Sequence, residues 1–254
     1  MMQKSSNPVF KNLAKQAAIT TDSATITGIT FKTIILLLLT FGSAAVSVIF
    51  GLKAVNVPGA GVGFYAEPWL YVILGISFFT SFISVMVANF FPRVAMPFSM
   101  LYSLGQGAVL GTLTAIIDFF IPGSAVTALI GVGSIFLVML FLYTSRAFRV
   151  TSKFRKVMFA SLIAILITSI ATGILSMFQV FPTMSVSMSI VISVVLIIFG
   201  AFMLMLDFDY ADSITTYGFP KQYEWVAALG FMVTLVWIYV QVLRLIVLFA
   251  SRRD

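Results

Sequence analysis

Long runs of apolar residues alternate with short polar links along the chain. The runs, each close to twenty residues long, cover about residues 31–50, 69–91, 94–117, 123–144, 157–178, 183–206 and 223–249. An α-helix needs roughly 20 apolar residues to cross a hydrocarbon core about 30 Å thick. The pattern therefore predicts an all-α, polytopic membrane protein, folded as a bundle of seven transmembrane helices.

Proline residues mark most of the predicted connections. They lie between successive apolar runs, at Pro58, Pro92, Pro122, Pro182 and Pro220. Proline ends or offsets a helix because it lacks an N–H group and crowds the preceding turn. The first connection also contains GAGVG at residues 59–63, which we interpret as an exposed loop because no phosphate-binding helix pattern follows it.

The composition agrees with the membrane interpretation and excludes several functions. Hydrophobic residues make up 61% of the chain and charged residues 9%, and the mean hydropathy is +1.12; soluble proteins are about 45–50% apolar and about 25% charged. Cysteine and histidine are absent, which removes thiolate metal sites, H-E-x-x-H zinc proteolysis and Ser-His-Asp hydrolysis. We therefore expect no enzymatic activity and no cofactor, and a response to physiological pH would depend on carboxylates.

Lysine and arginine are distributed unevenly between the two sides of the predicted bundle. One side carries the polar arm of residues 1–30, Arg93, Lys221 and the basic residues between 146 and 156, whereas the other carries only Lys53 before the last helix. Because basic loops stay on the inner side, we expect a multi-pass protein of the cell membrane with a cytoplasmic N-terminus. The basic tail after residue 250 then falls outside, so either it is a tolerated exception or one apolar run is re-entrant.

The basic residues lie between apolar runs and form no face with interleaved aromatics, so we expect no nucleic-acid partner. The first apolar run is too long and starts too late for a typical signal peptide, which predicts an uncleaved first helix. The arm that precedes it is interpreted as either a disordered tail or a docking segment.

Ionisable side chains are costly inside a bilayer and are therefore candidates for function. The sequence LDFDYAD closes the sixth apolar run, and it places Asp207 and Asp209 where a helix meets water. These two residues are either a solvated acidic cap or a functional site. Asp118 and Glu67, near the ends of other runs, are interpreted as interfacial residues.

Uncharged polar residues mark two further positions. Gln106 lies in LYSLGQGAVLG, where Gly107 and Gly111 form a GxxxG pattern that permits close helix packing. On the last helix Thr234 and Gln241 are seven residues apart and share a face, with Arg244 one turn further on. We expect this side of the helix to face the bundle interior.

The chain resembles the transmembrane Bax inhibitor motif proteins, also called the Bax inhibitor/YccA family, in its bacterial-type branch. The resemblance rests on SNPVF at 6–10, LYSLGQGAVLG at 101–111, FRVTSKFRKV at 148–157, LDFDYAD at 206–212 and YEWVAALGFMVTLVWIYVQVLRL at 223–245. It implies a seven-helix bundle with the last helix central, and a pH-sensitive calcium leak. In that family a carboxylate pair on the sixth and seventh helices shares a proton, and an arginine after the second helix latches onto it.

Carried onto this sequence, the resemblance makes Asp207 the sixth-helix carboxylate and Arg93 the latch, whereas Thr234 occupies the position of the second acid. Gln106 and Gln241 also stand where related sequences often have glutamate. Asp209 or Glu224 remain alternatives as the partner of Asp207.

Two functions follow as hypotheses. The first is a passive, pH-modulated cation pathway, with calcium or protons as ligands, gated by Asp207 and Asp209 with Arg93 as latch and lined by Gln106, Thr234 and Gln241. The second is a non-conducting regulator that binds another membrane protein, such as a quality-control protease, through the arm of residues 1–30.

Overall fold

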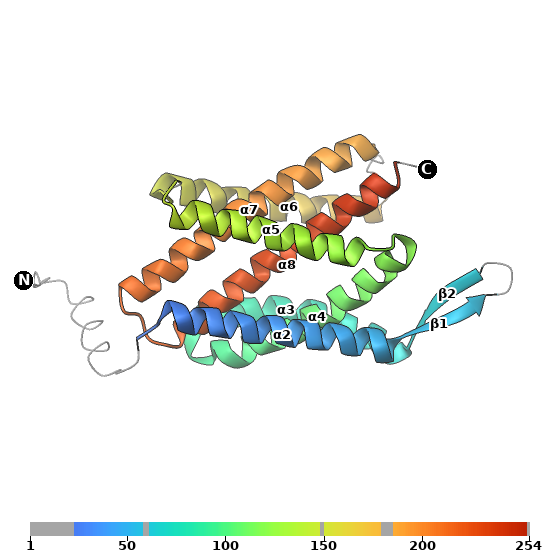
Figure 1. Ribbon diagram of the computed structural model, residues 1–254, viewed down its shortest axis with the longest axis horizontal. Helices are drawn as coiled ribbons and strands as arrows, with labels where there is room; N and C mark the ends of the chain where they lie inside the picture. The colour runs from blue at the N-terminus through green and yellow to red at the C-terminus, as the bar shows by residue number, and fades with distance from the viewer. Residues whose placement is uncertain (1–22, 58–60, 148–149, 179–184, 253–254) are drawn as a thin grey trace, which may run out of the picture. The chain divides into compact units, whose positions relative to one another are not determined.

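The computed structural model of the protein describes residues 23–57, 61–147, 150–178 and 185–252, and most of them are helical (Figure 1). The long helices are α2 (Ile26–Gly51), α3 (Pro68–Phe90), α4 (Ala95–Phe120), α5 (Ser124–Thr144), α6 (Ser152–Met177), α7 (Val186–Thr216) and α8 (Tyr223–Ala250). All seven are long and apolar enough to cross a membrane. The predicted all-α, polytopic bundle is confirmed.

Large apolar side chains cover the outside of these helices. Phe78 on α3 is 73% exposed and Phe141 on α5 is 69% exposed. Exposed apolar surface on this scale is unfavourable in water, whereas in lipid it has no such cost. The exposed phenylalanines therefore agree with a bilayer as the surrounding solvent.

Several helix boundaries differ from the predicted ones, and the caps of α2 and α7 give the reason for two of these differences. The helix α2 begins at Ile26, inside the predicted arm, because the Thr25 hydroxyl accepts a hydrogen bond from the Gly28 N–H at 3.0 Å. The helix α7 continues to Thr216 and ends where Gly218 adopts φ +65 and the Phe219 N–H donates to the Ile214 carbonyl at 2.9 Å. This is a glycine-based C-terminal cap, and it places the LDFDYAD segment within the helix.

A β-hairpin follows α2 and was not predicted from the sequence (Figure 1). It consists of β1 (Leu52–Val57) and β2 (Gly61–Ala66), paired antiparallel with Lys53 opposite Tyr65. The interpretation of residues 59–63 as a loop is therefore wrong for 61–63, which lie in β2.

At the base of the hairpin Lys53 forms an ion pair with Glu67. The hydrogen bond between the two side chains and the negative charge of Glu67 raise the pKa of Lys53. Glu67 immediately precedes α3 and makes no side-chain capping bond to it. The interfacial interpretation of Glu67 agrees with this position.

The chain forms two compact units, and α4, α7 and α8 contribute to both. The first unit contains Met1–Leu113 and Tyr210–Met232, and the second contains Thr114–Asp209 and Val233–Asp254. Buried residues occur along α8 in each unit, including Leu229 in the first and Ile238 in the second.

In the first unit, the GxxxG glycines of α4 lie against α2. A Cβ atom at Gly111 would lie 2.6 Å from the Ala44 Cα atom, so no larger side chain fits. Hydroxyl groups connect the two backbones, since Thr40 donates to the Ser103 carbonyl and Ser47 to the Ala108 carbonyl, both at 3.3 Å. The predicted role of this pattern in close packing is confirmed.

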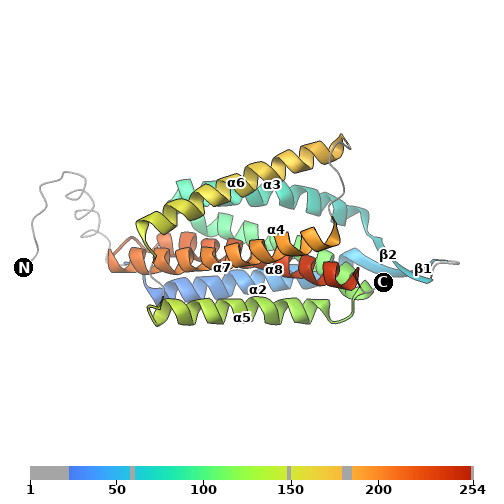
Figure 2. The same ribbon diagram turned by 90° about the horizontal axis from the view of Figure 1, so that it is seen from above.

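In the second unit, α7 packs against α8 (Figure 2). A Cβ atom at Gly200 would lie 2.7 Å from Ile238 Cγ1. The indole N–H of Trp237 donates to the Leu196 carbonyl at 3.4 Å. These contacts hold α7 and α8 side by side, and the same two helices carry Asp207 and Thr234.

Candidate functional site

Asp207 of α7 meets Thr234 of α8 within the second unit. The Thr234 side chain forms a hydrogen bond with the Asp207 carboxyl group. The second carboxyl oxygen, Oδ2, is buried and has no hydrogen-bond partner among the described residues. No ion pair in the described part of the chain involves Asp207. The two positions that the resemblance pairs are therefore in contact, with a hydroxyl group where the family pattern has a second acid.

Asp209 is directed to a different neighbour. Its Oδ2 atom lies 2.5 Å from the Arg155 guanidinium, which is 53% exposed and belongs to the beginning of α6. Residues two apart on a helix point about 200° away from each other, which separates Asp209 from the face that carries Asp207. Asp209 is thus the partner of Arg155, a residue that the sequence analysis treated only as a topology signal.

Thr234 and Gln241 are both buried, as their shared helix face predicted. The Gln241 Oε1 atom is buried and lacks a hydrogen-bond partner within the residues that the structure describes. Arg244 is exposed, contrary to the expectation that it follows the same side. Arg244 lies ten residues beyond Thr234, a rotation that leaves it about 80° from the direction of Thr234, and its long side chain can carry the charge out of the apolar interior.

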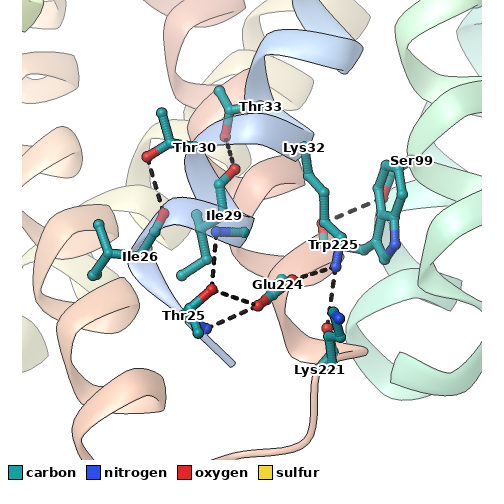
Figure 3. A network of polar contacts seen from close by, with 11 residues as sticks. Thr25, Ile26, Ile29, Thr30, Lys32, Thr33, Ser99, Lys221, Glu224 and Trp225 are labelled. Atoms are coloured by element: carbon teal, nitrogen blue, oxygen red, sulfur yellow. Dashed lines mark hydrogen bonds and ion pairs between the residues drawn. The ribbon is translucent and has the colours of Figure 1, made fainter. Parts of the chain in front are cut away.

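A second polar cluster lies in the first unit and was missed by the sequence analysis. Glu224, at the start of α8, is 1% exposed and forms an ion pair with Lys32 of α2 at 2.5 Å (Figure 3). Its Oε1 atom accepts hydrogen bonds from the Thr25 N–H at 2.8 Å and the Thr25 hydroxyl at 3.2 Å. Both carboxylate oxygens are therefore occupied.

The surroundings of Lys32 complete this cluster. Its ammonium group also donates to the Lys221 carbonyl at 3.3 Å and lies 5.2 Å from the centroid of the Trp225 ring (Figure 3). The glutamate carboxylate fills the space beside Gly28, where any Cβ atom would clash with it. One signal in the sequence could have indicated this cluster: Lys32 is a charged residue at the second position of the first apolar run, where a charge is costly without a partner.

The segment before α2 is held by the connection between α7 and α8. The Ala24 N–H donates to the Phe219 carbonyl at 2.8 Å, and Ser23 forms an antiparallel bridge with Pro220. Together with the bonds from Thr25 to Glu224, these contacts fix the point at which the N-terminal arm joins the first unit. Residues 1–22 of that arm lie outside the described residues.

The remaining predicted site residues are less constrained. Arg93 is exposed in the 3-10 turn η1 (Pro92–Val94), and Gln106 is half-buried on α4. Both belong to the first unit and Asp207 to the second, so the latch between Arg93 and Asp207 stays a prediction. Glu224, the other alternative partner of Asp207, bonds to Lys32 and Thr25 instead.

Asp118 lies near the end of α4 and organises the start of α5. Its carboxylate accepts hydrogen bonds from the Ser124 hydroxyl at 3.2 Å and the Ala125 N–H at 2.9 Å. An acceptor here satisfies a free N–H group at the helix N-terminus. This structural role agrees with the interfacial interpretation of Asp118.

These observations define a polytopic helical membrane protein with a buried carboxyl group between its last two helices. A family model described as Bax inhibitor 1 like matches residues 7–251, and the chain belongs to this family. The resemblance drawn from the sequence is therefore confirmed. Comparison with curated proteins gives no match.

Proposed function

We propose that the protein is a passive cation pathway, with calcium as the candidate ion, and that its conduction depends on pH. The observation that carries the proposal is the Asp207 carboxyl group, which Thr234 holds by one hydrogen bond while its Oδ2 atom is buried without a partner. Calcium prefers several oxygen ligands, and carboxylates and amide carbonyls both serve. Gln241 supplies a second unpartnered oxygen in the same unit.

Proton binding to Asp207 is the step to which we assign the pH dependence. An ionised carboxylate with a buried oxygen and no paired cation is unfavourable in an apolar interior, and a proton removes that charge. Thr234 does not titrate, so it cannot share a proton as a second carboxyl group would. The gate of this protein is therefore a single acid, whose titration follows one proton rather than two coupled ones.

The orientation of the protein is part of the same proposal. The uneven distribution of lysine and arginine supports a cytoplasmic N-terminus in the cell membrane. Asp209 and Arg155 would then lie near the cytoplasmic ends of their helices. Arg93 would act as the latch on that side, and Gln106 would add polar lining to the path.

Calcium flux into vesicles tests this function. Purified protein is reconstituted with an internal calcium indicator, and uptake is measured at two pH values for the wild type, Asp207→Asn and Asp212→Asn. Asp212 is an exposed carboxylate on the same helix and serves as the matched control. We expect pH-dependent uptake in the wild type and the control, and pH-independent uptake in Asp207→Asn. Equal background uptake in every sample would remove the proposal.

A second candidate function is a non-conducting regulator that binds another membrane protein. Its support is that Gln106, Thr234 and Gln241 are uncharged where the resemblance implies acids, together with the fixed attachment of the N-terminal arm next to Glu224. The test is co-purification in mild detergent with and without residues 1–22. The deletion must stop before Ser23, because Thr25 both caps α2 and bonds to Glu224. A partner that is retained only by the full chain would support regulation.

A further inference from the structure

The buried side of α3 carries hydroxyl groups, although its outer side is strongly apolar. The buried residues of this helix are Leu70, Ser77, Ser81, Ser84 and Ala88. Their spacing of seven, four, three and four residues places them on one stripe. Small serine side chains let transmembrane helices approach closely, but each buried hydroxyl still needs a hydrogen-bond partner.

Two serines of the stripe, Ser77 and Ser81, lie next to Gly105 of α4 in the same unit. A Cβ atom at Gly105 would lie 3.3 Å from Ser77 Oγ and 3.5 Å from Ser81 Oγ. The absence of a side chain at Gly105 therefore leaves the serine hydroxyls next to the α4 helix. We call the three serines of the stripe, Ser77, Ser81 and Ser84, together with Gly105 the α3–α4 seam.

Two hydroxyls of the seam have no hydrogen-bond partner. Ser81 Oγ and Ser84 Oγ are buried and unpartnered within the described part of the chain. Serine and threonine in a transmembrane helix ordinarily donate to a carbonyl of their own helix. Ser99 does so to the Ala95 carbonyl at 2.7 Å, and Thr112 to the Ala108 carbonyl at 2.8 Å. Ser81 and Ser84 form no such bond in the described part of the chain.

Water is the ligand that fits these two groups. A buried hydroxyl that makes no hydrogen bond is unfavourable, and native proteins satisfy such groups with internal water. Residues three apart on a helix have Cβ atoms about 5–6 Å apart, a separation that one water molecule bridges with two hydrogen bonds. Buried waters typically make about three hydrogen bonds to otherwise unsatisfied groups.

We propose that the α3–α4 seam is an internal water site, in which one water molecule is hydrogen-bonded to both Ser81 and Ser84. This site belongs to the first unit, whereas Asp207 belongs to the second, and the proposal does not depend on the protein conducting ions. It places water inside the first unit, where the neighbouring Gly105 directly precedes Gln106 in the sequence.

Solid-state NMR of the full chain in lipid tests the proposal without any substitution. Magnetisation is transferred from water protons to the protein, and the build-up rate is compared between serine Cβ signals. Ser99 is the matched control, because it is equally buried on the neighbouring helix and bonds to protein carbonyls. We expect the signals of Ser81 and Ser84 to build up several-fold faster than that of Ser99. Build-up as slow as that of Ser99 would overturn the proposal.

The stability of alanine variants gives an independent outcome. In a dry seam, Ser84→Ala removes an unsatisfied hydroxyl, so the midpoint of thermal unfolding stays the same or rises. In a hydrated seam the substitution removes a bonded partner of the water, and we expect the midpoint to fall by a few degrees. The midpoint of Ser99→Ala should fall in either case, because this hydroxyl is bonded to protein carbonyls. This control shows that the assay detects the loss of one hydroxyl group. An unchanged or higher midpoint for Ser84→Ala, with a lower midpoint for Ser99→Ala, would contradict the water site.

Discussion

Replacing Lys32 by methionine removes the positive charge from the buried ion pair with Glu224. The methionine chain still packs beside Trp225, so the change isolates the ammonium group. Glu224 is 1% exposed and keeps only its two bonds from Thr25. Removing one partner of a buried pair costs about 3–5 kcal/mol. Because hydrogen bonds to a charged group persist, we expect a loss near the lower limit, about 3 kcal/mol.

The losses in stability of related variants distinguish the buried pair of Lys32 and Glu224 from an ordinary surface pair. Glu224→Gln should cost less than Lys32→Met, because Lys32 is 12% exposed and can extend its charge towards water. The double variant removes both charges, so its loss should be smaller than the sum of the two single losses. Lys53→Met, at the exposed pair with Glu67, is the matched control and should change stability little.

Equilibrium unfolding in mixed micelles measures these differences, and in a background with Trp69→Phe and Trp237→Phe the fluorescence of Trp225 reports on the immediate surroundings of the pair. A loss of under about 1 kcal/mol for Lys32→Met would place the pair among screened surface contacts. That result would refute the argument that burial and the Thr25 bonds make Glu224 dependent on its cation.

Three further outcomes follow from the contacts described above. Gly111→Val should destabilise the protein by about 1–3 kcal/mol or prevent folding, because the valine side chain meets the backbone of α2. Gly75→Val is the control and should escape this steric cost, because no atom lies within 4 Å of a Cβ at Gly75. Thermal unfolding of the two variants measures the difference. Arg155→Gln should change the free energy of unfolding by under about 1 kcal/mol, and the difference should shrink at high salt. Glu67 raises the pKa of Lys53, so the contribution of this ion pair to stability is present below the ordinary pKa of 10.5 and is lost as pH rises through the raised value. NMR titration of the Lys53 Nζ group should give a lower pKa in Glu67→Gln than in the wild type.

The seven spans were predictable because each needs only an unbroken apolar run of the right length. The end of α7 was misplaced because the acidic residues after 206 were assigned to water, although the backbone stops only at the Gly218 cap. The hairpin was missed because its strands are short and contain few polar residues that alternate with apolar ones.

The candidate site was predictable only in part. Family resemblance brought Asp207 and Thr234 together, a contact that hydropathy alone does not indicate. Lys32 and Glu224 are 192 residues apart in sequence, and Arg155 and Asp209 are 54 apart. Neither pair forms a local pattern, so their partners follow only from the packing of helices.

The pH dependence of calcium flux in vesicles tests the central claim most directly, when it is measured across the full range for the wild type, Asp207→Asn and Thr234→Asp. We predict that the wild type follows the titration of one proton, that Asp207→Asn loses the dependence, and that Thr234→Asp shows two coupled steps from a restored acid pair. Background flux in the wild type at every pH, or an unchanged profile in Asp207→Asn, would contradict the account of Asp207 as the gate.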